Sequence, residues 1–246
     1  MYRKIKLLIL ITTLIFFSFC RKDVKTIPDH LRKGTAEYYM NNGYKSLNLG
    51  SLNIAMEQFR KALKKKPGLM KSSMGLGIVY LKQRKFKESL KLFTDIAKHY
   101  PSNADAFNFM GIIHSELGNY ESAKENFLIA ANSQHYSTPE NAFLNLALLE
   151  VKAKRLDNAL RYIEKGIINN PEFVSLFNLK GSIYEEKGFY KKAKALYEQS
   201  LMSKILDASG IPTTLKKRRF QMVLPISRDI LDITLTDSLK YIVDKS

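Results

Sequence analysis

Histidine and carboxylate side chains are the groups of this chain best suited to acid–base or metal chemistry. The four histidines are His30, His99, His114 and His135. No two of them stand at a metal-binding spacing on one helix, and no constellation of thiols or carboxylates accompanies them. The adjacent acids Glu185 and Glu186 lack a complementary acid or nucleophile, so we interpret them as part of a solvated helix face. The sequence therefore predicts a protein that is not an enzyme and that uses no cofactor or metal.

Cys20, the one cysteine of the chain, ends an apolar run that follows a basic start. A single cysteine excludes an internal disulfide framework and a cysteine-based zinc site. The 13 residues 7–19, LLILITTLIFFSF, carry no charge. A transmembrane helix needs about 20 apolar residues, so this run fits the apolar core of an export signal better than a membrane span.

The segment around Cys20 resembles a bacterial lipoprotein signal, in which the cysteine becomes the lipidated first residue. Ser18 fits the small residues of that pattern and Phe19 departs from it, as in the looser signals of spirochaete lipoproteins. The resemblance implies a signal peptide at residues 1–19, a lipid on Cys20, and an exported, membrane-anchored protein at the periplasmic face of the outer membrane. The alternative is an uncleaved anchor in which Cys20 is an incidental apolar residue.

The chain is strongly basic, with 40 Lys and Arg against 23 Asp and Glu, a net charge of +17. This charge favours anionic partners such as lipid headgroups, nucleic acid or acidic protein surfaces. Between Arg60 and Lys98 there are twelve basic residues and two acids. One interpretation is a solvated lysine-rich surface. The other is contact with anionic lipid through six side chains: Lys64, Lys65, Lys66, Arg84, Lys85 and Lys87. Nucleic acid is the least favoured partner, because an exported chain rarely meets it and no known binding module is present.

A repeat of about 34 residues runs through the middle of the chain. One column of small residues consists of Gly43, Gly77, Gly111, Ala147 and Gly181, and a second of Ala55, Ser89, Ala123, Ala159 and Ala193. A column of large apolar residues follows at Phe59, Phe93, Phe127, Ile163 and Tyr197. Small residues let two helices approach closely, and large ones fill the space between neighbours. Each unit is therefore predicted to be a helical hairpin that buries its apolar face by stacking on the next.

These columns resemble the tetratricopeptide repeat, as do the segments FNFMGIIH, FNLKGSIY and AMEQFRKALKKKP. The resemblance implies an all-α, right-handed solenoid of about five hairpins with C-terminal capping helices. The hairpins are expected at residues 36–67, 70–101, 104–135, 140–171 and 174–205, in a solenoid that spans 36–205. Residues 20–35 are interpreted as a tether and residues 206–246 as a capping segment.

In this family the first helix of each unit lines a concave surface in which ligands commonly lie. Carried over residue by residue, the resemblance predicts a mostly apolar groove formed by Met40, Tyr44, Leu47, Met74, Ile78, Leu81, Asn108, Ile112, Leu144, Leu148 and Asn178, with Val151 and Ser182 on the same columns. The alternative is that these residues pack inside the solenoid.

The function predicted from these features is a lipid-anchored scaffold that binds an extended or helical segment of another protein. The resemblance places it in bacterial cell-envelope assembly, of the pilus or outer-membrane type. One alternative is an adaptor with an uncleaved anchor, or a basic adaptor that binds nucleic acid. Another is an accessory subunit that docks an envelope enzyme.

Overall fold

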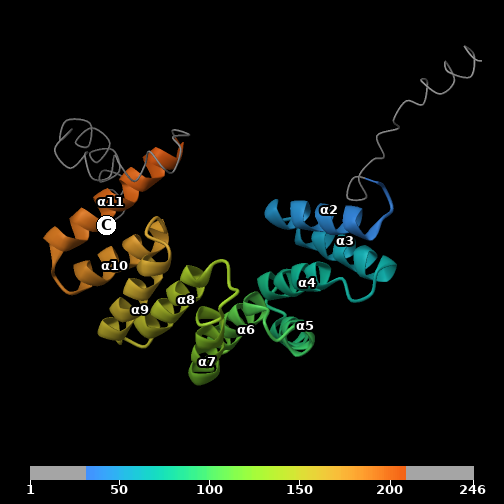
Figure 1. The fold of residues 1–246 in the computed structure, drawn as a ribbon, viewed down its shortest axis with the longest axis horizontal. Coiled ribbons are helices and arrows are strands. Elements are labelled where there is room, and N and C mark those ends of the chain that lie inside the picture. The colour runs from blue at the N-terminus through green and yellow to red at the C-terminus, as the bar shows by residue number, and fades with distance from the viewer. Residues whose placement is uncertain (1–31, 209–246) are drawn as a thin grey trace, which may run out of the picture. The chain divides into compact units, whose positions relative to one another are not determined.

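The computed structural model describes residues 32–208 (Figure 1). These residues belong to two compact units. The first unit ends at Ser137 and the second begins at Thr138. Within the described range there are ten helices, paired into five hairpins, and no strand. The prediction of an all-α fold made of about five helical hairpins is confirmed. The predicted signal peptide, most of the tether with Cys20, and nearly all of the capping segment lie outside the described residues.

The first unit contains three hairpins joined in sequence. Its helices are α2 (Ala36–Asn48), α3 (Leu52–Lys65), α4 (Met70–Lys82), α5 (Phe86–His99), α6 (Ala104–Glu116) and α7 (Tyr120–Ala131). Helix α2 begins at an N-cap, Thr35, whose Oγ1 accepts a hydrogen bond from the backbone N–H of Tyr38 at 3.1 Å. Such a cap satisfies one of the free N–H groups of the first turn.

The second unit contains two hairpins, with helices α8 (Pro139–Lys152), α9 (Leu156–Asn169), α10 (Val174–Glu186) and α11 (Tyr190–Ala208). Pro139 opens α8, where its fixed φ suits the first helical turn and its missing N–H costs nothing. Helix α9 ends two residues before Pro171, because proline cannot continue a helix. No proline stands at the corresponding place in the last hairpin, and α11 runs on to Ala208, past the residue 205 where the hairpin was expected to end.

All five hairpins turn between their helices in the same way. A residue with left-handed φ follows the first helix and donates its N–H to the carbonyl three residues earlier, at 2.8 to 3.2 Å. The next residue donates to the carbonyl five residues earlier, at 2.7 to 2.9 Å. This pair of bonds defines the Schellman motif. Glycine takes the left-handed position in three turns, as Gly50, Gly118 and Gly188, but Arg84 and Lys154 take it in the other two, with φ of +58° and +57°.

The large apolar column forms the centre of each hairpin. Phe59, Phe93, Phe127 and Ile163 are all buried. The ring of Phe59 fits between two glycines, because a Cβ on Gly43 would lie 2.6 Å from its Cε1 atom and one on Gly75 would overlap the ring. Glycine is therefore required at both positions; Gly43 belongs to the predicted column of small residues, whereas Gly75 does not. Burying a phenylalanine in this way removes its whole side chain from water.

Neighbouring hairpins inside each unit pack through these same helices. In the first unit α3 contacts α4 and α5 contacts α6, while the first helices also meet, α2 with α4 and α4 with α6. In the second unit α9 contacts α10. The first helices of the first unit thus form a continuous surface, and this surface carries most of the predicted groove residues.

Candidate protein-binding face

The groove residues of the first unit lie on three neighbouring first helices, α2, α4 and α6. Six of the eight are partly buried, so their apolar atoms are only partly removed from water: Met40, Tyr44, Met74, Ile78, Leu81 and Ile112. We call the surface formed by Met40, Tyr44, Met74, Ile78 and Ile112, together with Asp105, the binding face. Its apolar positions follow two columns of the repeat, one with Met40 and Met74 and the other with Tyr44, Ile78 and Ile112.

Two predicted groove residues are not available to a partner. Leu47 belongs to the buried core around Phe59, and Asn108 is buried in α6. The prediction that they line a groove is wrong. Both are buried although they share their repeat columns with residues that are only partly buried, Leu81 for Leu47 and Met74 for Asn108, so local packing and not the column decides their exposure.

Tyr44 is held firmly by the fold. Its hydroxyl donates a hydrogen bond to the backbone carbonyl of Lys71 on α4 at 2.6 Å, and its ring meets Phe59 edge-on with centroids 5.0 Å apart. Burial, and to a smaller degree the charge of Asp105, raises the pKa of the Tyr44 hydroxyl. Tyr44 therefore ties α2 to α4 and forms the floor of the binding face.

Methionine and isoleucine side chains continue the face over α4. Ile78 packs against the core around Phe59 and against a second core around Phe93, and Met74 packs against the second. In that second core Phe93 stacks on Phe109, with ring centroids 4.8 Å apart. Methionine adapts its shape to varied apolar partners, so a surface that contains Met40 and Met74 suits recognition of another chain.

Asp105, on the first turn of α6, is a residue of this face that sequence reasoning missed. Burial raises the pKa of its carboxyl, and its charge acts on Tyr44. Within residues 32–208 it has no hydrogen bond or ion pair. A half-buried carboxylate without a partner is costly, which makes it an acceptor for an N–H or cationic group. The repeat column carries no signal of this, because Asp105 shares it with Lys71 and Glu37, which differ in charge.

The groove residues of the second unit are placed on α8 and α10. Leu144 and Val151 pack against the core around Ile163, Leu148 is exposed to 46%, Asn178 is partly buried and Ser182 is exposed. They form a less continuous apolar surface than the first unit does, and we treat them separately from the binding face.

The six basic residues predicted to touch anionic lipid form two groups at opposite ends of one helix. Lys64, Lys65 and Lys66 lie at the end of α3, next to the start of α4, while Arg84, Lys85 and Lys87 follow the end of α4. With 13 residues in α4 and about 1.5 Å per residue, the groups are about 20 Å apart. The six residues thus form two groups, and their contact with anionic lipid stays a prediction.

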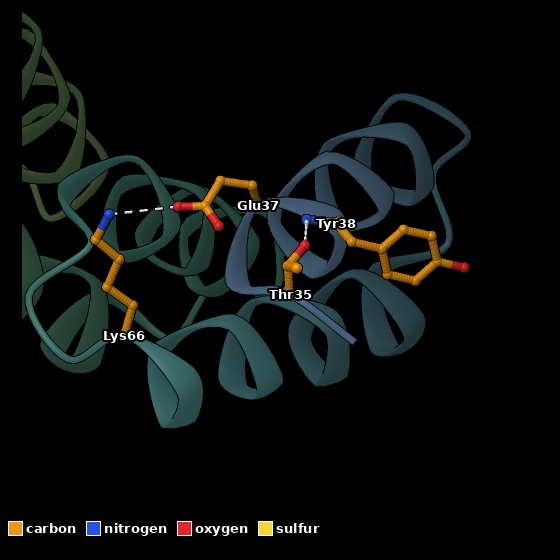
Figure 2. Close-up of polar contacts among 4 residues, drawn as sticks. All are labelled: Thr35, Glu37, Tyr38 and Lys66. Atoms are coloured by element: carbon orange, nitrogen blue, oxygen red, sulfur yellow. Dashed lines mark hydrogen bonds and ion pairs between the residues drawn. The ribbon is translucent and has the colours of Figure 1, made fainter. Parts of the chain in front are cut away.

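Some of these cations already have partners. The Nζ atom of Lys66 lies 3.3 Å from Oε1 of Glu37, as Figure 2 shows. Backbone hydrogen bonding at the start of α2, with a smaller effect of Lys66, lowers the pKa of Glu37. Arg84 lies 3.5 Å from a carboxylate oxygen of Glu116 on the next hairpin. Lys64 and Lys65 remain exposed at the end of α3.

His114 occupies the column that holds tyrosine in the second and fifth hairpins. Its Nδ1 atom is buried without a hydrogen-bond partner in the described part of the chain. At the same column of the fourth hairpin Glu150 is buried and paired with Arg155 at 2.9 Å. Among residues 32–208 no group of three or more His, Cys, Asp and Glu side chains could hold a metal ion. None of the helices described there has the length and apolar character needed to cross a membrane.

Comparison with known sequences identifies the repeat. The chain matches the tetratricopeptide repeat over residues 74–137 and 110–174, and again over residues 174–204. These matches together span just over half of the chain, so the chain belongs to the tetratricopeptide repeat family. Repeats of this family are generally non-catalytic scaffolds that bind other proteins, in agreement with the protein-binding part of the prediction.

One relative is the anaphase-promoting complex subunit 3 of Schizosaccharomyces pombe, which is 28% identical over 144 residues, 58% of this chain and 21% of the relative. The chain thus spans about a fifth of the length of the relative that it matches. Among solved structures, PilF of Pseudomonas aeruginosa has a TM-score of 0.61 at 20% identity and covers 82% of this chain and 97% of its own.

Two other solved structures share the fold. A thermophilic tetratricopeptide repeat protein of Thermus thermophilus has a TM-score of 0.60 at 16% identity, covering 77% of this chain and 99% of its own. A MamA structure from Desulfovibrio magneticus has a TM-score of 0.53 at 16% identity, covering 69% and 94%. At these identities the likeness concerns the fold alone.

Proposed function

We propose that this protein is a scaffold that binds a segment of another protein on the binding face of its first unit, and that a lipid on Cys20 holds it at a bacterial envelope membrane. The observation that carries the binding part is a partnerless, half-buried Asp105 on the same surface as Met40, Met74 and Ile78. The membrane part rests on the apolar run before Cys20. The proposal includes a role in pilus or outer-membrane assembly, and identification of the partner tests that role.

The chemistry of the face defines the partner segment. Apolar side chains would cover the methionines and Ile78, since removing apolar surface from water contributes about 25 cal/mol per Å². An N–H group, or a lysine or arginine side chain, would face Asp105 and satisfy its carboxylate. A helix or an extended strand with one basic residue among apolar ones meets both needs.

The partner can be found by crosslinking in cells. A photoreactive phenylalanine analogue replaces Met40, and crosslinked proteins are identified by mass spectrometry. The matched control carries the analogue at Ile168, which is exposed on α9 of the second unit. A partner specific to Met40 supports the proposal, whereas the same crosslinks from both positions would contradict it.

Asp105 gives a sharper test with the purified partner. Asp105→Asn keeps the shape and removes the charge, so affinity should fall at least about tenfold, because a hydrogen bond to a charged group contributes about 1.5–3 kcal/mol. The melting temperature should not fall, since burial disfavours the charged form. The control is Asp95→Asn, an exposed acid on α5. Equal affinity of both variants would remove Asp105 from the site.

The anchor is tested independently. Cys20→Ala should abolish incorporation of labelled fatty acid and leave the chain unprocessed or move it from the membrane fraction to the soluble one. Equal label in both proteins would refute lipidation at Cys20 and favour an uncleaved anchor.

A further inference from the structure

The turn between α10 and α11 exposes two aromatic side chains that the other turns do not. Phe189 is exposed to 48% and Tyr190 to 69%. The residues at the position of Tyr190 in the other four hairpins are partly buried: Leu52, Phe86, Tyr120 and Leu156. The position of Phe189 holds a polar residue in all four: Ser51, Lys85, Asn119 and Arg155. This turn therefore departs from the repeat in its apolar exposure, although its backbone closes in the same way.

The exposed aromatics lie among lysines. The Nζ atom of Lys192 is 5.1 Å from the ring centroid of Phe189 and 5.4 Å from that of Tyr184, and these two rings meet edge-on at 6.1 Å. Phe189 is therefore held in place by its neighbours. Tyr190 has no hydrogen bond or ring contact within the described part of the chain.

Most charged side chains around the turn already have partners. Lys187 pairs with Asp157, and Lys194 lies 3.8 Å from Glu198. Of the nearby acids, Glu185 accepts a hydrogen bond from Tyr197, and Glu186 is exposed.

Two cations of this turn are left over. Lys191 and Lys192 pair with no carboxylate among residues 32–208. They stand beside Tyr190, which has the most exposed aromatic side chain of the described residues. The pair is available to an anion.

We propose that this turn, with Phe189, Tyr190, Lys191 and Lys192, contacts an anionic lipid bilayer. Aromatic side chains concentrate at the level of lipid headgroups, and adjacent lysines are attracted to anionic lipids. A protein partner fits less well, because lysine is depleted in protein–protein interfaces. This inference deepens the proposed function and rests on it, since it assigns a second membrane contact to a chain that Cys20 would already hold at a bilayer.

The absence of tryptophan from the whole chain makes the contact directly measurable. The full-length Tyr190→Trp variant is mixed with vesicles of phosphatidylcholine and phosphatidylglycerol, and brominated lipids act as quenchers. The control is Ile168→Trp, which places the probe at a side chain exposed to 79% near the end of α9 in the same unit. Both probes start from comparable solvent exposure.

We expect the emission of Tyr190→Trp to shift to shorter wavelength and to be quenched, and that of Ile168→Trp to stay unchanged. Adding Lys191→Glu should reduce the quenching, as should high salt, because the lysine contribution is electrostatic. Unquenched Tyr190→Trp emission would overturn the proposal. So would a blue-shifted emission without vesicles, because it would show that another part of the chain or a second copy covers the turn.

The outcome is separable from that of the anchor. Sedimentation of the chain with the same vesicles reports any membrane attachment, whereas quenching reports contact at this turn. If the chain sediments with the vesicles but Tyr190→Trp is not quenched, the membrane anchor is supported and the contact at this turn is refuted. If Tyr190→Trp is still quenched in a chain that also carries Cys20→Ala, the contact at this turn is supported. Fatty-acid labelling tests lipidation of Cys20 separately.

Discussion

Lys154 holds a backbone conformation that its side chain disfavours, and replacing it with glycine should stabilise the second unit. At φ +57° a residue with a Cβ is strained by about 1–2 kcal/mol. Glycine removes the strain but adds about 0.5–1 kcal/mol of unfolded-state entropy. The expected net gain for Lys154→Gly is therefore about 0.5–1 kcal/mol. Arg84 is a poorer choice, because it also contacts Glu116 and lies 5.2 Å from the ring centroid of Phe86.

Urea unfolding followed by circular dichroism measures this gain as a higher midpoint. The matched control is Ala153→Gly, one residue earlier, where φ is −84° and glycine brings only the entropic cost. The control should lower the free energy of unfolding by about 0.5–1 kcal/mol. If both variants lose stability equally, left-handed strain at Lys154 is not the dominant effect and the reasoning fails.

Three further changes test the packing, the face and the turns. Phe59→Ala should lower the free energy of unfolding by about 3–5 kcal/mol, because it empties the space between Gly43 and Gly75; an unchanged urea midpoint would contradict this. Burial raises the pKa of Asp105 above its ordinary 3.8, so its contribution to stability is lost as the pH rises from below 3.8 through the raised pKa. Asp105→Asn should remove that loss, and melting profiles from about pH 3 to pH 7 that stay parallel would argue against it. Gly118→Ala should cost about 0.5–1 kcal/mol net, because the left-handed strain at φ +78° exceeds the entropic gain of alanine and nothing lies within 4 Å of a Cβ there; equal melting temperatures would contradict this.

The hairpins could be predicted from sequence because their packing depends on residue size at fixed intervals. Phe59 and Gly43 are 16 residues apart in the sequence and face each other in the structure, as a small column opposite a large one requires. The turn glycines likewise sit at positions where only left-handed φ closes the Schellman bonds. The size of a side chain and the preference of glycine for left-handed φ are properties of the residue type, so one sequence is enough to recognise both patterns.

The binding face was harder to predict, because exposure depends on neighbours that a repeat column does not specify. Leu47 and Asn108 share columns with partly exposed residues, yet local packing buries both. Tyr44 and Ile78 contact the core as well as the face, so replacing them with aspartate would disturb folding together with binding. Asp105 escaped notice because a carboxylate near a helix start is ordinary until burial shows that it lacks a partner.

The two glycines that hold Phe59 come from different hairpins, and this has a consequence for synthesis on the ribosome. Gly43 belongs to the first hairpin and Gly75 to the second, so a single hairpin offers the ring only one of its two walls. The first core closes only after α4 has emerged, when three helices are present. Leu92 of the following helix, α5, then adds to this core, and because its helix contacts are local in sequence, folding can proceed from the N-terminal side while synthesis continues.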